Sequence, residues 1–325
     1  MCPAWLRGPK AMGWLKEPIR LLGRWASAPS AETPEDRAGA GDGPGVELKF
    51  PACIEEEFPQ WFPAAWDAVE QTLKAVQDAD LTPLERRSPG LKGYAWDTYL
   101  RCSVVRMVHA AQALHDRGVG GGLLLDYGSY FGNFALMFAK LGYQVHAVDA
   151  YQQYGLAFGS VTRLLLNNEI EVHDLSEGGL GSEKSMPYDV VISAGVIEHI
   201  PHTPRYFLET LNALLRPSGW LLLDTPNLAY LYNRQKLARG ETIFCPISCQ
   251  YGTDLPFEGH HREYTIAEMR WMLERIGHRD IAVQTFNYSL YGAPVLLGLD
   301  AANYRQMMED PSAREVILTV SRKAS

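Results

Sequence analysis

The chain has 325 residues, an ordinary globular composition and a formal net charge of −8 at pH 7. This length fits one large α/β domain with additions, or two modest domains. The acidic balance argues against a protein whose whole surface binds nucleic acid, because phosphate binding needs a concentrated basic face. No apolar stretch approaches the roughly 20 residues that cross a bilayer, and the scattered cysteines are typical of reduced thiols. We therefore expect a soluble, cytoplasmic protein without a nucleic-acid partner.

The first 45 residues differ in character from the rest. Residues 1–27 mix basic side chains with tryptophan, leucine and isoleucine, which is typical of a segment lying on an anionic membrane surface. The alternative is a leader that packs on its own domain, because Pro9 and Pro18 allow only short helical pieces. Residues 30–45 are rich in Ala, Gly, Pro and acidic residues and predict a flexible linker. A peripheral contact with the inner face of a membrane is thus one option for residues 1–27.

Residues 46–120 have a helical pattern. Apolar residues recur at helical spacing over residues 61–79 and 94–117, and the glycines in 118–122 end the second of these helices. We expect an N-terminal helical extension here, followed by the main domain over residues 121–325.

Short apolar segments alternate with helical patterns from residue 121 onward. The expected strands lie at about 123–126, 144–149, 170–175, 188–195, 219–227, 281–288 and 315–321, and the main expected helices begin near 131, 150, 203 and 266. This alternation predicts an α/β fold with a doubly wound, mostly parallel seven-stranded Rossmann-like sheet. Ligands of such sheets bind beyond the carboxyl ends of the strands.

The segment "LLLDYGSYFGNFALMFAKLGYQVHAVDA", residues 123–150, predicts a strand, a tight turn, a helix and a second strand. A dinucleotide site needs a further glycine two positions after the first, so that a pyrophosphate can approach the backbone. Tyr130 stands at that position after Gly128, which argues against NAD or FAD. Asp149 ends the second strand, where a carboxylate accepts hydrogen bonds from ribose hydroxyls. The turn is expected to hold a nucleoside without a diphosphate.

Four segments follow the order and spacing of one protein family: "LLLDYGSYFGNFALMFAKLGYQVHAVDA", "YDVVISAGVIEHI", "LLRPSGWLLLDTPN" and "HHREYTIAEMRWMLERIG". With them the chain resembles class I S-adenosylmethionine-dependent methyltransferases over roughly residues 94–285. The resemblance is strongest to the bacterial small-molecule and glycan branch, which is similar to ubiquinone-type O-methyltransferases. It implies S-adenosyl-L-methionine as the cofactor. Tyr130 departs from the glycine that the family commonly has there, and this narrows the methionine end of the site.

The resemblance also implies which residues bind the cofactor. The turn after the first strand and the end of the fourth strand would lie beside the methionine part, Asp149 would hold the ribose, and the residues after the second and third strands would contact the adenine. The full set is Asp126, Gly128, Ser129, Tyr130, Gly132, Asp149, Ala150, Tyr151, Asp174, Leu175, Ser193, Ala194 and Gly195. An alternative for Asp126 and Asp149 is the capping of turns and helix starts.

Glu198 and His199 follow the fourth strand and are the candidate catalytic residues. Methyl transfer to a hydroxyl gains from a base that removes its proton, and histidine has a reference pKa near neutrality. His199 is therefore the first choice for the base. The alternative is that this pair only orders the loop, because the family carries it in members with different acceptors.

An insertion rich in aromatic residues, 228–259, follows the fifth strand, where the family builds its acceptor pocket. The candidate acceptor-binding residues flank or belong to it: Asn227, Tyr230, His260, His261, Arg262 and Tyr264. Thr265 is expected to cap the next helix. Cys245, Cys249 and the two adjacent histidines lack the usual zinc spacing, so no metal site is predicted.

The function expected from these features is S-adenosylmethionine-dependent methylation, on oxygen, of a small-molecule or glycan-type acceptor. Two alternatives are kept. One is a quinone or lipid-phenol methyltransferase held at the membrane by residues 1–27, and the other is a regulatory protein that binds the cofactor without turnover.

Overall fold

The computed structural model describes residues 48–87, 93–156, 159–177, 187–201, 203–245, 247–252, 257, 259–292 and 299–325. The expected leader and linker, and with them the membrane contact of residues 1–27, lie outside this part of the chain. Among the described residues, no helix combines the length and apolarity that a bilayer-spanning helix needs.

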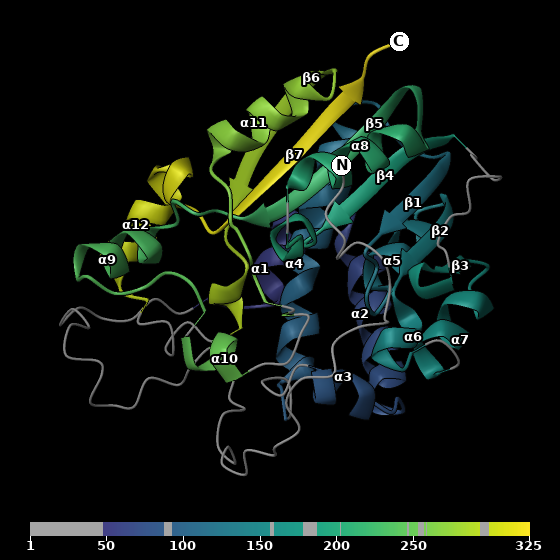
Figure 1. Ribbon diagram of the computed structural model, residues 1–325, viewed down its shortest axis with the longest axis horizontal. Coiled ribbons are helices and arrows are strands. Elements are labelled where there is room, and N and C mark those ends of the chain that lie inside the picture. Colours follow the sequence, from purple (N-terminus) through teal and green to yellow (C-terminus); the bar gives the residue numbers. More distant parts are fainter. Residues whose placement is uncertain are drawn as a thin grey trace, which may run out of the picture.

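A seven-stranded sheet with the order β3-β2-β1-β4-β5-β7-β6 forms the centre of the fold (Figure 1). Its strands are β1 (Leu123–Tyr127), β2 (Gln144–Asp149), β3 (Glu171–Asp174), β4 (Tyr188–Ala194), β5 (Leu215–Pro226), β6 (His278–Phe286) and β7 (Val316–Lys323). Strands β1 to β5 run parallel, whereas β7 is antiparallel to both β5 and β6. The predicted doubly wound, mostly parallel Rossmann-like sheet is confirmed.

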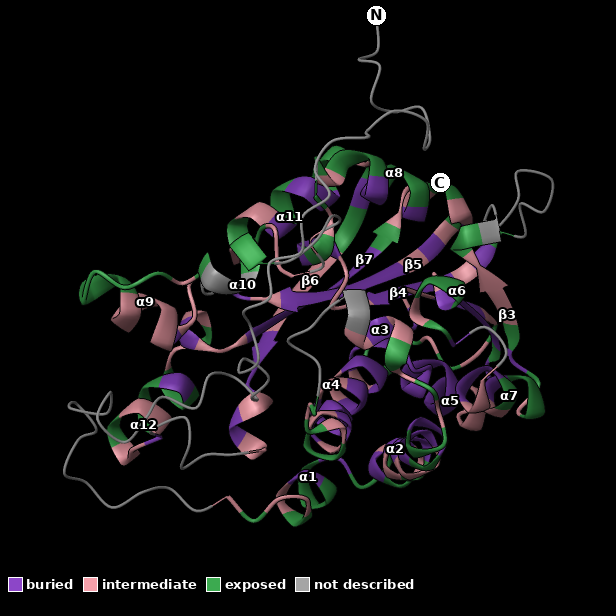
Figure 2. Cartoon of the chain, turned by 60° about the horizontal axis from the view of Figure 1, so that its bottom comes forward, coloured by how far each residue is buried: buried purple, intermediate pink, exposed green. Residues whose placement is uncertain are grey.

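Helices pack on both faces of the sheet, and others lie beside it (Figure 1). They are α1 (Ala52–Glu57), α2 (Phe62–Gln77), α3 (Thr82–Arg87), α4 (Trp96–His115), α5 (Asn133–Lys140), α6 (Tyr151–Tyr154), α7 (Ser160–Asn167), α8 (Pro204–Leu214), α9 (Leu231–Ala238), α10 (Ile247–Gly252), α11 (Ile266–Arg275) and α12 (Ala301–Glu309). One apolar core joins α2, α4, α5 and α7 to one face, and a second joins α8 and α11 to the other (Figure 2). Alternate strand residues supply the two cores, as Leu124 and Leu125 do in β1, because successive side chains of a strand point to opposite faces.

The chain order of the strands creates the place for a ligand. Strand β1 lies between β2 and β4, and the connection from β1 leads to β2 whereas that from β4 leads to β5, in opposite directions across the sheet. In such sheets the crevice lies beyond the carboxyl ends of the two diverging strands. Here those ends are Tyr127 in β1 and Ala194 in β4.

Several elements differ from the sequence prediction. The helix expected over 150–168 is divided into α6 and α7, and Gly155 after α6 has a left-handed φ of 75°. A Cβ there would lie 2.5 Å from Pro83 Cγ, so the chain breaks where α3 packs against it. Helix α12 forms in a stretch expected to be irregular, and Thr265 caps α11 as predicted.

Gly132 and Gly142 allow the packing around the first turn to be tested separately from backbone strain. Both have positive φ, but a Cβ at Gly132 would lie 2.5 Å from Leu165 Cδ2, whereas Gly142 has nothing within 4 Å. Gly142→Ala should cost only the strain of about 1–2 kcal/mol. Gly132→Ala should lower the free energy of unfolding by roughly 2–4 kcal/mol, because overpacking adds to that strain. Denaturant unfolding measures both, and equal losses would contradict the packing role of Gly132.

Candidate functional site

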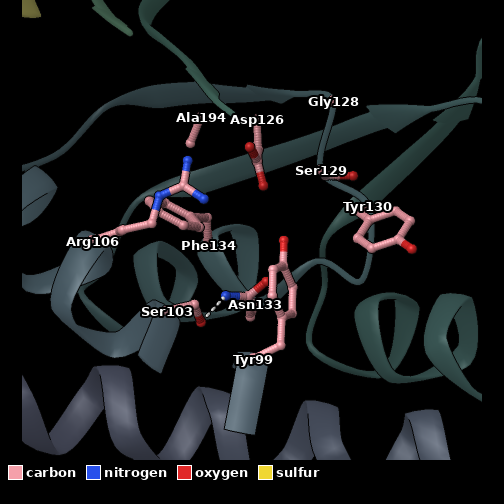
Figure 3. A pocket seen from close by; sticks show the side chains of 10 residues that line it. All are labelled: Tyr99, Ser103, Arg106, Asp126, Gly128, Ser129, Tyr130, Asn133, Phe134 and Ala194. Atoms are coloured by element: carbon pink, nitrogen blue, oxygen red, sulfur yellow. Dashed lines mark hydrogen bonds between the residues drawn. The ribbon is translucent and has the colours of Figure 1, made fainter. Parts of the chain in front are cut away.

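A pocket opens beyond the carboxyl ends of β1 and β4 (Figure 3). It is lined by Tyr99, Ser103, Arg106, Asp126, Gly128, Ser129, Tyr130, Asn133, Phe134 and Ala194. Five of these ten, Asp126, Gly128, Ser129, Tyr130 and Ala194, belong to the cofactor-binding set expected from the sequence. The pocket therefore lies at the sheet edge where a ligand of this fold is expected.

Backbone hydrogen bonds fix the turn between β1 and α5. The amides of Gly128 and Ser129 both donate to the Val148 carbonyl, at 2.8 and 3.2 Å, which ties the turn to β2. Asp126 Oδ2 accepts from the Ala135 amide at 3.1 Å, near the start of α5. Gly132, the residue that precedes α5, has a φ of 75° and cannot gain a side chain without displacing Leu165.

Tyr130 takes the backbone conformation that glycine favours. Its φ is 49°, in the left-handed region, and its amide donates to Asp149 Oδ2 at 2.7 Å. Its ring packs against Phe131, Tyr154 and Trp96, with centroid distances of 4.1, 5.7 and 6.1 Å. The side chain of Tyr130 thus forms part of the pocket lining, and the narrowing of the methionine end stays a prediction.

Asp149 and Asp174 are register partners at the ends of β2 and β3. Asp149 Oδ1 accepts from the Ala150 amide at 2.6 Å, and with Tyr130 on Oδ2 each oxygen has one backbone donor. Asp174 accepts from the amides of Gln152 and Ser176, each at 2.7 Å. A carboxylate has about four acceptor sites, so each of these groups can accept several hydrogen bonds.

Tyr151 and Ser129 are joined by a hydrogen bond between their hydroxyls. Tyr151, the first residue of α6, is fully buried, so its ring lies inside the fold next to the turn. Leu175, by contrast, is partly exposed just after Asp174. The expected adenine contacts of Ala150, Tyr151 and Leu175 stay predictions, and Leu175 is the most exposed of the three.

The end of β4 is closely packed. Ser193 is buried and donates from its hydroxyl to the Tyr127 carbonyl at 2.8 Å, whereas the next residue, Ala194, lines the pocket. Gly195 has a φ of 66°, and a Cβ there would lie 2.7 Å from Arg106 Nη2. A glycine at position 195 therefore leaves room for the Arg106 guanidinium.

Arg106 and Asp224 form a buried ion pair that the sequence analysis missed. The Arg106 Nε donates to Asp224 Oδ2 at 3.1 Å, and its Nη2 donates to Oδ1. The Asp224 side chain is fully buried, and the guanidinium lies 5.4 Å from the centre of the Tyr288 ring. Although burial opposes the charged form, Asp224 raises the pKa of Arg106. Arg106 thus brings a permanent positive charge to the pocket wall.

Three pocket residues come from one helix, α4. Tyr99, Ser103 and Arg106 lie four and three residues apart, so they share one helical face. Ser103 Oγ accepts from Asn133 Nδ2 at 2.9 Å, which joins α4 to α5. The signal available in the sequence was this polar stripe at helical spacing.

Two buried carboxyl groups near the pocket have elevated pKa values. Burial raises the pKa of Asp126 to about 7, and Asp149 and Asp224 act in the same direction. Burial also raises the pKa of Glu198 to about 7. A cation near these groups favours their ionised form and is itself stabilised by them. The pocket wall thus combines the Asp126 carboxyl group with the Arg106 guanidinium.

Glu198 and His199 are adjacent in sequence but differ in environment. Glu198 is buried, and its Oε2 accepts from the Thr225 hydroxyl at 3.0 Å. Its backbone carbonyl accepts from the amides of His261 and Arg262, at 2.7 and 3.3 Å. His199 is exposed, and its ring lies 4.8 Å from that of His260.

His260 completes a second group of titratable side chains at this edge. Its Nδ1 lies 2.9 Å from Glu263 Oε1. Although burial opposes the charged form, Glu263 and Glu198 raise the pKa of His260. Glu198, His199 and His260 also offer one potential metal-ligand atom each within 4.8 Å of one another, a grouping that the spacing argument did not anticipate.

The other candidate acceptor residues make extensive contacts within the fold. Asn227 is buried, donates to the carbonyls of Ser312 and Arg314 and accepts from the Ala229 amide. Asn227 and Tyr264 form an isolated bridge, which brings the two ends of the insertion together.

The remaining candidates line the same region. Tyr230 packs against Tyr232, with ring centroids 5.3 Å apart. His261 contacts the Phe257 carbonyl at 3.0 Å, and the Arg262 guanidinium pairs with Glu268. Contact of all these side chains with an acceptor stays a prediction.

The comparison with protein families gives one assignment. The model described as "Methyltransferase domain" matches residues 98–283, more than half of the chain. Among curated proteins, the chain is similar to the ubiquinone biosynthesis O-methyltransferase of Caulobacter sp. (strain K31), with 32% identity over 114 residues, 35% of this chain and 40% of that protein. The corresponding protein of Leptothrix cholodnii is 27% identical over 113 residues, 34% of this chain and 43% of that protein. The chain thus spans about two fifths of the length of these relatives.

Solved structures with a similar fold include phosphoethanolamine N-methyltransferase 2 of Haemonchus contortus, in complex with S-adenosyl-L-methionine. The identity is 15%, the TM-score is 0.43, and the match covers 66% of this chain and 52% of that one. A SAM-dependent methyltransferase from Archaeoglobus fulgidus is 17% identical with a TM-score of 0.44, over 67% of this chain and 94% of that one. Because the family model matches most of the sheet-forming region in the order expected from the motifs, the chain belongs to the methyltransferase domain family.

Proposed function

We propose that this protein transfers the methyl group of S-adenosyl-L-methionine to a hydroxyl oxygen of a small molecule. The observation that carries the proposal is the pocket beside the turn after β1, where Asp149 holds the Tyr130 amide and buried carboxyl groups have elevated pKa values. The cofactor carries a sulfonium and an ammonium group, so an acidic pocket favours it over a neutral nucleoside.

The proposed cofactor orientation follows the edge of the sheet. The methionine part lies in the pocket among Gly128, Ser129 and Ala194, with Arg106 available to its carboxylate. The ribose hydroxyls donate to Asp149, and the adenine lies toward Asp174 and Leu175. The register pairing of Asp149 with Asp174 supports this order, because it sets the two carboxylates on neighbouring strand ends.

Methyl transfer depends more on the alignment of the acceptor oxygen with the methyl group than on the activation of the acceptor. Bound S-adenosyl-L-methionine supplies a methyl group on a good leaving group, and holding the acceptor oxygen in line with it contributes about 7–11 kcal/mol. His199, exposed at the same edge, would accept the proton of the acceptor hydroxyl as the oxygen–methyl bond forms and the sulfur–methyl bond breaks, with S-adenosylhomocysteine as the leaving group. Glu198 is a positioning residue, since its carbonyl and carboxylate join the His199 segment to residues 261–262 and to β5.

An oxygen acceptor is supported by the names of the curated relatives, which are O-methyltransferases of ubiquinone biosynthesis. Phenols are the acceptors whose proton a histidine removes most easily near neutral pH, because their pKa lies closer to that of imidazole than an alcohol's does. Aromatic side chains of the insertion, such as Tyr230 and Tyr232, suit flat rings. A glycan acceptor is the alternative within the same reaction class.

Asp149→Ala tests the cofactor assignment. Loss of charge-assisted hydrogen bonds to the ribose should weaken S-adenosyl-L-methionine binding by about 10- to 150-fold, corresponding to roughly 1.5–3 kcal/mol. Calorimetry measures the affinity. Asp189→Ala is the matched control, because Asp189 also accepts from a backbone amide, that of Leu123 at 2.7 Å, yet lies at the opposite end of the sheet. Equal affinities in the wild type and Asp149→Ala would remove the ribose assignment.

His199→Ala tests the proposed base. Turnover should fall by roughly 10²–10⁴-fold, with cofactor affinity almost unchanged, because the side chain acts on the acceptor. Formation of S-adenosylhomocysteine with a panel of phenols, catechols and sugars gives the rate. His115→Ala, an equally exposed histidine at the end of α4, serves as the control. An unaffected rate in His199→Ala would reduce that residue to a structural part of the loop.

A further inference from the structure

Two histidines and a glutamate gather on β2 and β3, away from the pocket. His146 and Glu171 are register partners, and His173 lies two residues further along β3 on the same face of the edge strand. This is the face that carries Leu125 and Val148 in the core under α8. His146 precedes Asp149 by three residues, so it lies about 10 Å from the end of β2. The cluster is therefore separate from the cofactor edge.

The spacing of the polar atoms matches the coordination sphere of a small metal ion. His146 Nε2 lies 3.3 Å from Glu171 Oε2, and His173 Nε2 lies 3.3 Å from Glu171 Oε1. The three residues offer one ligand atom each within 4.8 Å of one another. Ligands at about 2.0–2.2 Å from a tetrahedral zinc ion are separated by roughly 3.3–3.5 Å. Direct hydrogen bonds between such groups are shorter, at about 2.7–2.9 Å.

Tyr188 supplies an outer contact. Its hydroxyl lies 2.9 Å from His146 Nδ1, whereas Glu171 faces Nε2, and His173 Nε2 lies 3.5 Å from the same Nδ1. Metal-binding histidines almost always bond through their other nitrogen to a polar group, which fixes the ring and its tautomer. When Nε2 binds a metal, Nδ1 carries the proton and donates to the Tyr188 oxygen. Tyr188 is buried, so this contact is held in place by the core of β4.

The exposure of the three side chains leaves one coordination position of the ion open to solvent. The His146 side chain is 4% exposed and that of His173 is 17% exposed, whereas that of Glu171 is 51% exposed. Water can therefore reach the cluster from the Glu171 side. Two imidazoles and one carboxylate are a ligand set of zinc sites that keep a water molecule in the fourth position.

We propose that His146, Glu171 and His173 bind a divalent transition-metal ion of the zinc type, with water as the fourth ligand. The ion joins the edge strand β3 to β2 at a point where β3 has hydrogen-bonding partners on one side only. Its expected effect is on stability, because an ion that binds the folded chain and not the unfolded one raises the free energy of unfolding.

The test is a titration of the full chain, without a histidine tag and after removal of metals with EDTA, with ZnCl₂ in a calorimeter. Glu171→Gln should weaken zinc binding at the cluster by at least about tenfold, and His173→Ala should do the same. Tyr188→Phe should weaken it by roughly 10- to 100-fold, which a purely packing role of the hydroxyl does not predict. Zinc should raise the melting temperature of the wild type but not that of Glu171→Gln.

His260→Ala is the matched control, because it disrupts the other group of potential ligands, Glu198, His199 and His260. It should leave zinc binding at the β2–β3 cluster unchanged. Substitution with Co²⁺ should give a visible spectrum of a four-coordinate ion without a thiolate charge-transfer band. The proposal is overturned if the wild type binds no zinc, if Glu171→Gln and His173→Ala bind it like the wild type, or if binding is lost only in His260→Ala.

Discussion

The hydrogen bond from the Tyr130 amide to Asp149 is the contact on which the rest of the site depends. A tyrosine with a φ of 49° carries a backbone cost of about 1–2 kcal/mol, which a charge-assisted hydrogen bond of roughly 1.5–3 kcal/mol can offset. The same carboxylate accepts from the amide of Ala150, the residue that precedes α6. One side chain at the end of β2 thus sets both the turn after β1 and the segment that follows β2, and the pocket lies between them.

Charge is the second constraint on the pocket. Asp126, Glu198 and Asp224 are all buried around the diverging ends of β1 and β4, with Arg106 as the cation that pairs with Asp224. Because burial disfavours ionisation, the remaining two carboxyl groups are partly protonated near neutral pH. Each has a folded-state pKa above its ordinary value, so the stability it contributes is present below about pH 4 and is lost as the pH rises toward 7. A bound cation favours the ionised carboxylates and so offsets this loss of stability. The charge of the ligand is thereby linked to the stability of the protein.

The fold was predictable because its signals are local. Alternating apolar strands, the glycine turn and the carboxylates at strand ends are readable within a few residues, and the doubly wound, mostly parallel sheet follows from the alternation. The division of the helix after β2 was not predictable, since it depends on contact of Gly155 with Pro83, far away in the sequence. Short helices such as α12 have too few residues to show a clear helical spacing of apolar side chains.

Only those site residues that lie at the ends of strands could be predicted from the sequence. The turn residues and Asp149 are next to β1 and β2, so topology alone brings them together. Arg106 comes from a helix 20 residues before Asp126, and its role rests on an ion pair with Asp224, more than a hundred positions away. The cluster of His146, Glu171 and His173 was missed for a related reason, because its spacing appears only once β2 and β3 are in register.

The most direct measurement of the central claim, that the pocket is built for a cationic nucleoside, is calorimetry of cofactor binding at pH 7 in buffers of different ionisation enthalpy. S-adenosyl-L-methionine should bind with release of protons from Asp126 and Glu198, because its positive charge lowers pKa values that burial has raised. S-adenosylhomocysteine lacks the sulfonium charge and should release fewer protons. Absence of binding, or equal proton release with both ligands, would contradict the account.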